Sequence, residues 1–160
     1  MLLQTPRAEW PCDAVQPVLF TLEYGLVKLW EWFGVRPSCV VGHSFGEYMA
    51  AYVAGLFSLE EAVDIVAARG KLMGSTSVPG GMIAVQASID SVTQLLSNKI
   101  DAEDIAIANI NAPDQVVLSG SEDACRGWKQ ALEERGFKVT KLSVQAAFHS
   151  PLMNEAITPA

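Results

Sequence analysis

The five-residue segment Gly42-His43-Ser44-Phe45-Gly46 constrains the fold of this chain more than any other feature. It matches the pattern Gly-x-Ser-x-Gly and stands between a short apolar run, 38–41, and a helical pattern, 45–54. The apolar run predicts a buried parallel strand. Between a strand and a helix, the pattern is typical of a nucleophile elbow, in which small residues at positions 42 and 46 allow a sharp turn. The alternative is an ordinary turn in which Ser44 only caps the helix.

The patterns around this segment predict an α/β fold. Apolar residues recur at helical spacing from Leu19 to Phe33, which predicts an amphipathic helix whose apolar stripe faces a sheet. Ser58 to Glu61 has the Ser-x-x-Glu form of a capping box. This box should open a further helix that ends at Gly74.

A separate small unit is predicted from Gly80 onward, where the rhythm of apolar residues changes. Strands are predicted at 82–87, 105–109, 115–118 and 137–144, and helices at 89–96 and 122–135. This order, βαββαβ, is the ferredoxin-like split motif. We therefore expect residues 1–80 to form part of a large α/β subdomain, residues 81–145 to form the small ferredoxin-like one, and residues 146–160 to return to the large one.

Composition excludes several classes of function. With 160 residues, half of them apolar, the chain suffices for one globular domain with a small insertion. The net charge of −7 argues against nucleic acid or an anionic membrane surface as the main partner. Three widely spaced cysteines and two histidines predict neither a disulfide framework nor a metal site. No apolar stretch reaches membrane-spanning length, so we expect a cytoplasmic protein.

The serine needs a general base, because a hydroxyl at its ordinary pKa is a weak nucleophile. His43 adjoins Ser44 at a strand end, where successive side chains point to opposite sides, which disfavours it as the base. His149 follows the small unit and is the preferred base; the alternative is a histidine of a capped turn or of the core. No acidic residue stands out as a third member, so a Ser-His dyad is predicted. The Phe45 amide, at a helix N-terminus, should form half of an oxyanion hole.

Arg69 lies near the end of the third predicted helix. A lone arginine at such a position is usually a solvated charge that complements the helix dipole. The functional alternative is a bidentate clamp on a substrate carboxylate. The residue pattern alone leaves both interpretations open.

Four stretches together carry a resemblance to a known family: Val40 to Tyr48, Ala67 to Met73, Ile107 to Gly120 and Ala147 to Met153. In order and spacing they resemble malonyl-type acyltransferase domains of polyketide and fatty acid synthases. The resemblance implies an α/β-hydrolase-like large subdomain, here partial, with an inserted ferredoxin-like one. It also implies that Ser44 is acylated, that His149 is the base, and that Arg69 holds the free carboxylate of the extender unit.

The resemblance further implies an enzyme that transfers a malonyl group from coenzyme A to the phosphopantetheine thiol of an acyl carrier protein. Implied partners are malonyl-CoA, the carrier protein and neighbouring synthase domains, with no bound cofactor. Phe148 stands where malonyl-selective members usually have Phe, and Phe45 departs from the Gln that methylmalonyl enzymes favour. Ala146 departs from the usual His of the malonyl motif. Such domains normally begin with a Gly-Gln-Gly segment and continue further, so the chain is expected to be a piece of a larger synthase, of polyketide or fatty acid type.

Rival interpretations remain. A serine hydrolase would share the elbow, but it would need an acidic residue between Ser44 and His149 and would have no use for Arg69. An inactive truncated remnant, or a ferredoxin-like binding module, would need no site at all. For the carrier, we expect a docking surface at 125–141, where Arg126, Lys129, Arg135, Lys138 and Lys141 outnumber Glu133 and Glu134. A solvated helix surface is the alternative there.

Overall fold

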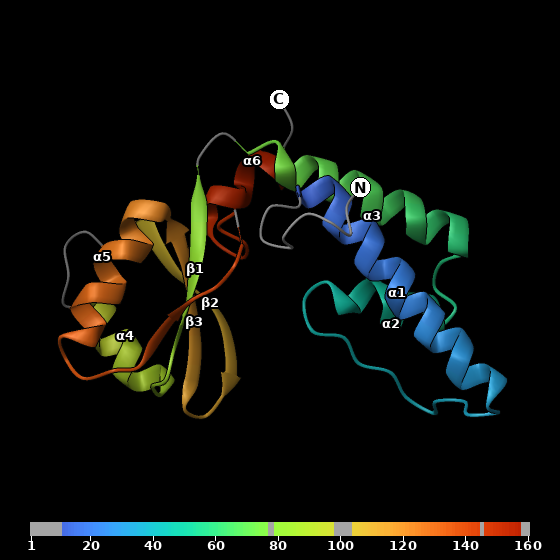
Figure 1. Ribbon diagram of the computed structural model, residues 1–160, viewed down its shortest axis with the longest axis horizontal. Coiled ribbons are helices and arrows are strands. Elements are labelled where there is room, and N and C mark those ends of the chain that lie inside the picture. The colour runs from blue at the N-terminus through green and yellow to red at the C-terminus, as the bar shows by residue number, and fades with distance from the viewer. Residues whose placement is uncertain (1–10, 77–78, 98–103, 145, 158–160) are drawn as a thin grey trace. The chain divides into compact units, whose positions relative to one another are not determined.

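The computed structural model describes residues 11–76, 79–97, 104–144 and 146–157. They divide into two compact units, Met1–Gly74 and Ser75–Ala160 (Figure 1). No helix in the described ranges is long and apolar enough to cross a membrane.

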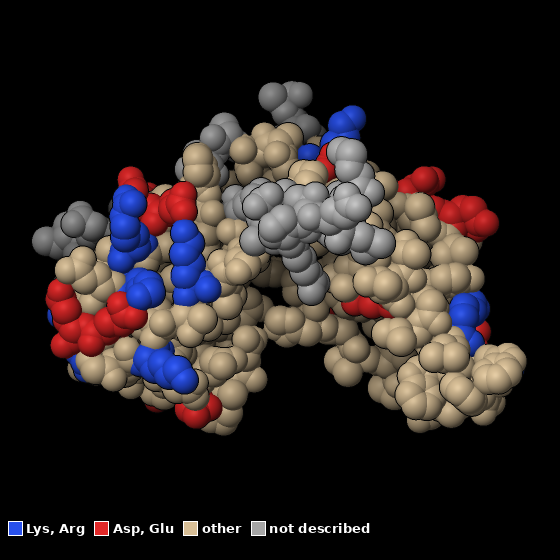
Figure 2. All heavy atoms as spheres, viewed as in Figure 1, with Lys and Arg blue, Asp and Glu red and all other residues tan. Residues whose placement is uncertain are grey.

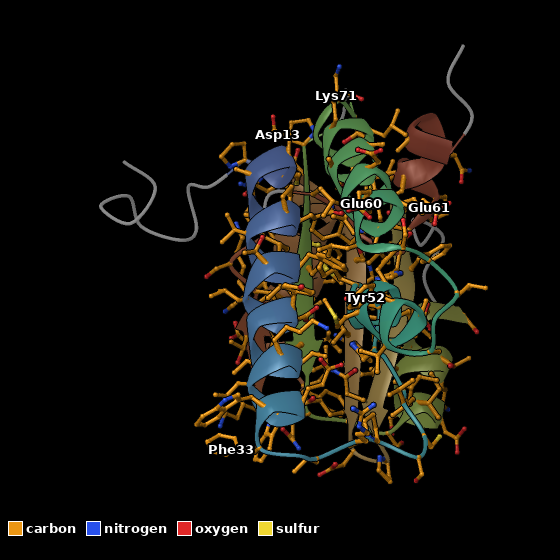
Figure 3. All side chains as sticks on the ribbon, turned by 90° about the vertical axis from the view of Figure 1, so that its right-hand side faces the viewer. Asp13, Phe33, Tyr52, Glu60, Glu61 and Lys71 are labelled. Carbon is orange, nitrogen blue, oxygen red and sulfur yellow. The ribbon has the colours of Figure 1, made fainter. Side chains whose placement is uncertain are left out.

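Three helices build the first unit: α1 (Cys12–Trp32), α2 (Gly46–Val53) and α3 (Leu59–Gly74). Figure 3 shows α1 and α3 side by side, with Asp13 of α1 and Lys71 of α3 at the same end of the pair. The two helices approach closely there, since a Cβ atom on Gly70 would lie 2.9 Å from the backbone oxygen of Cys12. This unit has a small core of its own, made of Phe20, Met49, Ala62 and Val66.

The start of α3 confirms the predicted capping box. The Ser58 N–H donates to Glu61 Oε2 at 2.8 Å, and the Glu61 N–H donates to Ser58 Oγ at 3.2 Å. Two helix-end amides are thereby satisfied. The helix ends at Gly74, as the sequence predicts.

The strand expected at 38–41 was predicted wrongly. Residues 35–43 form neither helix nor strand, and the Val41 side chain is 94% exposed. A buried parallel strand exists only between hydrogen-bonded neighbours and under covering helices. Among the described residues of the first unit there is no other strand with which this segment could pair.

The second unit confirms the predicted βαββαβ order. Its elements are β1 (Gly80–Val85), α4 (Ile89–Ser97), β2 (Ile105–Ala112), β3 (Gln115–Ser121), α5 (Glu122–Glu133) and β4 (Val139–Lys141). The sheet has the antiparallel order β2-β3-β1-β4, which is the ferredoxin-like arrangement. Figure 1 shows α4 and α5 on one face of this sheet.

The core of the second unit lies between that face and the two helices. Ile83, Val85 and Leu118 of the strands pack in one cluster with Trp128 and Leu132 of α5. The last strand is shorter than the predicted 137–144, although single hydrogen bonds extend it: Gln86 N–H donates to Lys138 O at 2.9 Å, and Leu142 N–H donates to Met82 O at 2.9 Å. Beyond it lie the 3-10 helix η4 (Pro151–Met153) and α6 (Asn154–Ile157).

Candidate active site

Ser44 has the backbone conformation of a nucleophile elbow. Its φ angle is +53°, in the left-handed region that residues with a Cβ atom rarely adopt. Gly42 is sterically required, because a Cβ atom there would lie 2.3 Å from the Glu47 backbone nitrogen. Gly46 is not, since a Cβ atom at that position would meet nothing within 4 Å. The expectation of small residues at both positions therefore holds for residue 42 alone.

The Phe45 amide stands at the N-terminus of α2, as predicted for an oxyanion-hole donor. The next three amides are used within the turn: Gly46, Glu47 and Tyr48 N–H donate to the oxygens of residues 43, 44 and 45, each at 3.1 Å. Among the hydrogen bonds of the described residues, the Phe45 N–H donates none. An amide in this position is suited to a developing negative charge on a bound acyl group.

His149 lies in the second unit, in a tight turn that places it at the surface. Ser150 N–H and Ser150 Oγ both donate to the oxygen of Ala147, at 3.2 Å and 2.7 Å. Ala147 and Ser150 are buried, whereas His149 is exposed, so it is not a core histidine. Its φ angle is +60°. Phe148, beside it, is half-buried.

Ser44 and His149 share one unusual property. They are the only non-glycine residues in the described ranges whose φ angle is positive. Each such conformation costs on the order of 1–3 kcal/mol and is retained mainly where a site requires it. The two residues that the sequence singles out as nucleophile and base are therefore also the two that the backbone singles out.

The Arg69 side chain is half-buried, so its charge is only partly exposed to solvent. Its Nη1 donates to Gln16 Oε1 of α1 at 2.7 Å. Its guanidinium carbon lies 5.7 Å from the centre of the Phe45 ring and 5.4 Å from that of the Tyr48 ring. Sequence reasoning missed Gln16 and Tyr48. For Gln16 a signal existed, because it is a polar residue one helical turn before the buried Phe20, on the same face of α1.

A groove of about 900 Å³ runs along the first unit beside the elbow. Its lining includes Val27 of α1, Val41 and Ser44 of the loop, and Met49 of α2. Glu23 of α1 lines it too, and its buried Oε2 atom has no hydrogen-bond partner among the described residues. Burial raises the pKa of the Glu23 carboxyl above its ordinary value.

The surface expected to receive a carrier protein is less basic than the sequence indicates. Arg126 pairs with Asp123, Lys129 with Glu133, and Lys141 with Glu122. Figure 2 shows acidic and basic side chains mixed over the second unit. In neither unit do the described residues include a group of three or more His, Cys, Asp and Glu side chains that could hold a metal ion.

Comparison with known proteins decides the family. The sequence model of the acyl transferase domain family matches residues 3–160 of this chain. The chain belongs to the acyl transferase domain family. Mycoketide-CoA synthase of Mycobacterium tuberculosis is 46% identical over 145 residues, which are 91% of this chain and 3% of that synthase. This membership confirms the resemblance carried by the four sequence stretches.

Solved acyltransferase structures confirm the predicted α/β class. The acyltransferase domain from the second module of the salinomycin polyketide synthase is 43% identical with a TM-score of 0.84, over 92% of this chain and 34% of that one. A malonyl CoA-acyl carrier protein transacylase from Clostridium perfringens is 29% identical with a TM-score of 0.81, over 91% of this chain and 47% of that one. The chain therefore spans less than half the length of either structure.

Proposed function

We propose that this acyltransferase chain carries a malonyl group from coenzyme A to the phosphopantetheine thiol of an acyl carrier protein, through an ester on Ser44. One observation carries the proposal: Ser44 and His149 alone, among the described non-glycine residues, hold the left-handed backbone conformation. Ser44 stands in an elbow that family membership associates with acyl transfer. The transacylase name of one structural neighbour supports malonyl-CoA as the donor.

In the proposed first half-reaction, the His149 imidazole takes the proton of Ser44 Oγ while that oxygen attacks the thioester carbon. The Phe45 amide donates to the oxyanion as the tetrahedral intermediate forms. When the C–S bond breaks, the imidazolium returns the proton to the departing sulfur. The products are malonyl-Ser44 and coenzyme A with a free thiol.

The second half-reaction reverses these roles with a new thiol. His149 takes the proton from the phosphopantetheine thiol of the carrier, and the sulfur attacks the ester of Ser44. The ester C–O bond breaks and Ser44 Oγ regains a proton, so the malonyl group leaves on the carrier. Arg69 binds the free carboxylate of the malonyl group throughout, and the Phe148 ring restricts substituents at its α-carbon.

The carrier protein is the proposed acceptor, with neighbouring synthase domains as further partners. Lys138 is the lysine of the 125–141 surface that has no ion pair among the described residues. We place the anionic carrier against this lysine and the adjacent end of β4. No bound cofactor or metal has a part in this scheme.

Intact mass measurement after incubation with malonyl-CoA tests the proposal. We expect the mass of one malonyl group to be added, and peptide fragmentation to locate it on Ser44. Ser44→Ala should abolish the adduct, and His149→Ala should reduce its rate of formation by several orders of magnitude. Ser38→Ala is the matched control, because Ser38 is an exposed serine of the same loop. An adduct that persisted on the Ser44→Ala protein would refute the assignment.

A further inference from the structure

The Arg69 guanidinium contacts three neutral side chains among the described residues of the first unit, which we call the arginine cradle: Gln16, Phe45 and Tyr48. Gln16 of α1 accepts a hydrogen bond from Nη1 at 2.7 Å. The rings of Phe45 and Tyr48, from the elbow and from α2, lie 5.7 and 5.4 Å from the guanidinium carbon. Both distances fall within the range of a cation–π contact.

The Gln16 amide is held at both ends. Its Oε1 accepts from Arg69, while its Nε2 donates to Met73 Sδ at 3.5 Å. The residue is only 6% exposed. A rotation of the amide by half a turn would present an NH₂ group to the guanidinium and lose both contacts. Gln16 therefore fixes one edge of the arginine from within the helix pair.

The two rings define the remaining orientation of the guanidinium. Their centres lie 5.8 Å apart with an angle of 36° between their planes, so they form one aromatic surface beside the arginine. Phe45 also carries the backbone amide next to Ser44. The cradle thus links the position of the cation directly to the elbow that holds the nucleophile.

Among the described residues, no carboxylate compensates the positive charge of Arg69. None of the ion pairs found among the described residues involves Arg69. A guanidinium that is partly withdrawn from water ordinarily takes a carboxylate as its partner. Here the partners are an amide oxygen and two ring faces, which orient the group without neutralising it. A carboxylate arriving with a ligand would be a far stronger partner than any of these.

We propose that Gln16 and Tyr48 are positioning residues that orient Arg69 toward the free carboxylate of the acyl group and so set the preference for dicarboxylic over monocarboxylic acyl units. This inference rests on the proposed function, in which Ser44 receives that acyl group. Neither residue touches the reacting atoms. Their effect is carried by the direction and the charge of the guanidinium.

Acylation of Ser44 by malonyl-CoA and by acetyl-CoA tests the role of Gln16. Gln16→Glu places a carboxylate on Arg69 and should lower the second-order rate constant for malonyl about 10- to 100-fold, while the acetyl rate changes less than about twofold. Gln16→Ala removes the contact without adding a charge and should cost malonyl transfer less. Equal losses for malonyl and acetyl would show that Gln16 serves only the fold.

Tyr48 offers a matched pair of variants. Tyr48→Leu removes the ring and should lower the malonyl rate constant about 2- to 10-fold with little change for acetyl. Tyr48→Phe keeps the ring and should retain the parent's ratio of malonyl to acetyl rates. A Tyr48→Phe protein as impaired as the Tyr48→Leu protein would exclude the ring as the cause.

Binding of free malonate separates this inference from the proposed function. In a ¹⁵N NMR titration of the arginine Nε–H signals, malonate should shift the Arg69 signal of the parent chain. The shift should be lost in the Gln16→Glu protein and weakened in the Tyr48→Leu protein, each first checked for native circular dichroism. If malonate binds in this way but Ser44 is never acylated, the proposed function fails and the cradle stands. If the parent and the Gln16→Glu protein bind malonate equally, the inference is wrong.

Discussion

Ser44 carries a backbone strain that its chemistry explains better than its packing does. Its φ angle of +53° places the Cβ atom against the following peptide, a conformation that glycine adopts without penalty. If position 44 had only a structural role, replacing the serine with glycine would increase the stability of the fold. A nucleophilic serine cannot be replaced in this way, because its hydroxyl carries out the reaction.

This contrast yields a prediction for two variants that both lack the hydroxyl. The Ser44→Gly protein should be more stable than the Ser44→Ala protein by about 1 kcal/mol, since only alanine retains the strained Cβ atom. Urea unfolding measures the difference, and neither protein should acquire a malonyl group. If the two variants unfold at the same urea concentration, the left-handed conformation is not retained in solution.

Glu23 supplies a second prediction at this scale, because its buried Oε2 atom has no hydrogen-bond partner in the part of the chain that the structure describes. Burial raises the pKa of this carboxyl, so the folded chain binds its proton more tightly than the unfolded chain does. The protein therefore loses stability when Glu23 ionises, that is, as the pH rises from the unfolded pKa through the higher folded pKa. Glu23→Gln should stabilise the protein at pH 7, by up to about 1 kcal/mol.

The pH dependence of this gain distinguishes the cause. Below the unfolded pKa, near 4.5, Glu23 is protonated in both states, so the advantage of glutamine should disappear. Thermal unfolding at pH 7 and at pH 4 tests this directly. Glu47→Gln is the control, since Glu47 is exposed on α2 of the same unit. A gain that is equal at both pH values would mean that the charge of Glu23 is not involved.

At the scale of elements, the segment before the elbow and the sheet of the second unit differ in the hydrogen bonds that stabilise their backbones. The central strands β1 and β3 have hydrogen-bonded neighbours on both sides and carry the largest core. Residues 36–43 belong to no helix or strand. They have no place in the hydrogen-bonded sheet that the described residues form.

Hydrogen exchange should separate these two regions. We expect the amides of β1 and β3 to exchange more slowly than those of residues 36–43 by at least about three orders of magnitude, because exchange from the sheet requires cooperative opening. Exchange monitored by mass spectrometry on the peptides that cover 36–43 and 115–121 measures this. Strong protection across residues 38–41 would show that the strand predicted from the sequence forms after all.

For the whole molecule, the dominant feature is apolar surface on the first unit. Val41 is 94% exposed, Trp32 78% and Leu56 70%. Exposed apolar area of this kind favours association with other apolar surfaces. The net charge of −7 opposes association but does not cover these side chains.

We therefore expect the isolated chain to self-associate at micromolar concentration, and Val41→Lys to raise the concentration at which it does so. Sedimentation velocity over a concentration series gives the measurement. Thr140→Lys is the matched control, because it adds the same charge at an exposed position on β4 of the second unit. If both substitutions suppress association equally, net charge is the cause and the surface around Val41 is not.

Local sequence patterns were sufficient to predict much of the secondary structure of this protein. The capping box at Ser58 and the βαββαβ order of elements were predicted correctly, because each element depends mainly on residues within a few positions of one another. At the elbow, the left-handed turn at Ser44 is present, but the strand predicted before it is not. The candidate residues Ser44, Phe45, Arg69 and His149 lie in short stretches of the sequence, but the role of Arg69 rested on the family resemblance. For the capping box and for the individual helices and strands of the second unit, neighbouring residues supply most of the physical cause.

Three further features depend on the tertiary structure: the contact between Gln16 and Arg69, the need for glycine at position 42, and the irregular backbone of residues 38–41. Gln16 and Arg69 are 53 positions apart and meet because α1 and α3 pack closely, which no periodicity encodes. The need for glycine at 42 rather than at 46 follows from where the first turn of α2 comes to lie. Residues 38–41 have the composition of a strand but remain irregular, since a strand is a property of its neighbours as much as of its own side chains.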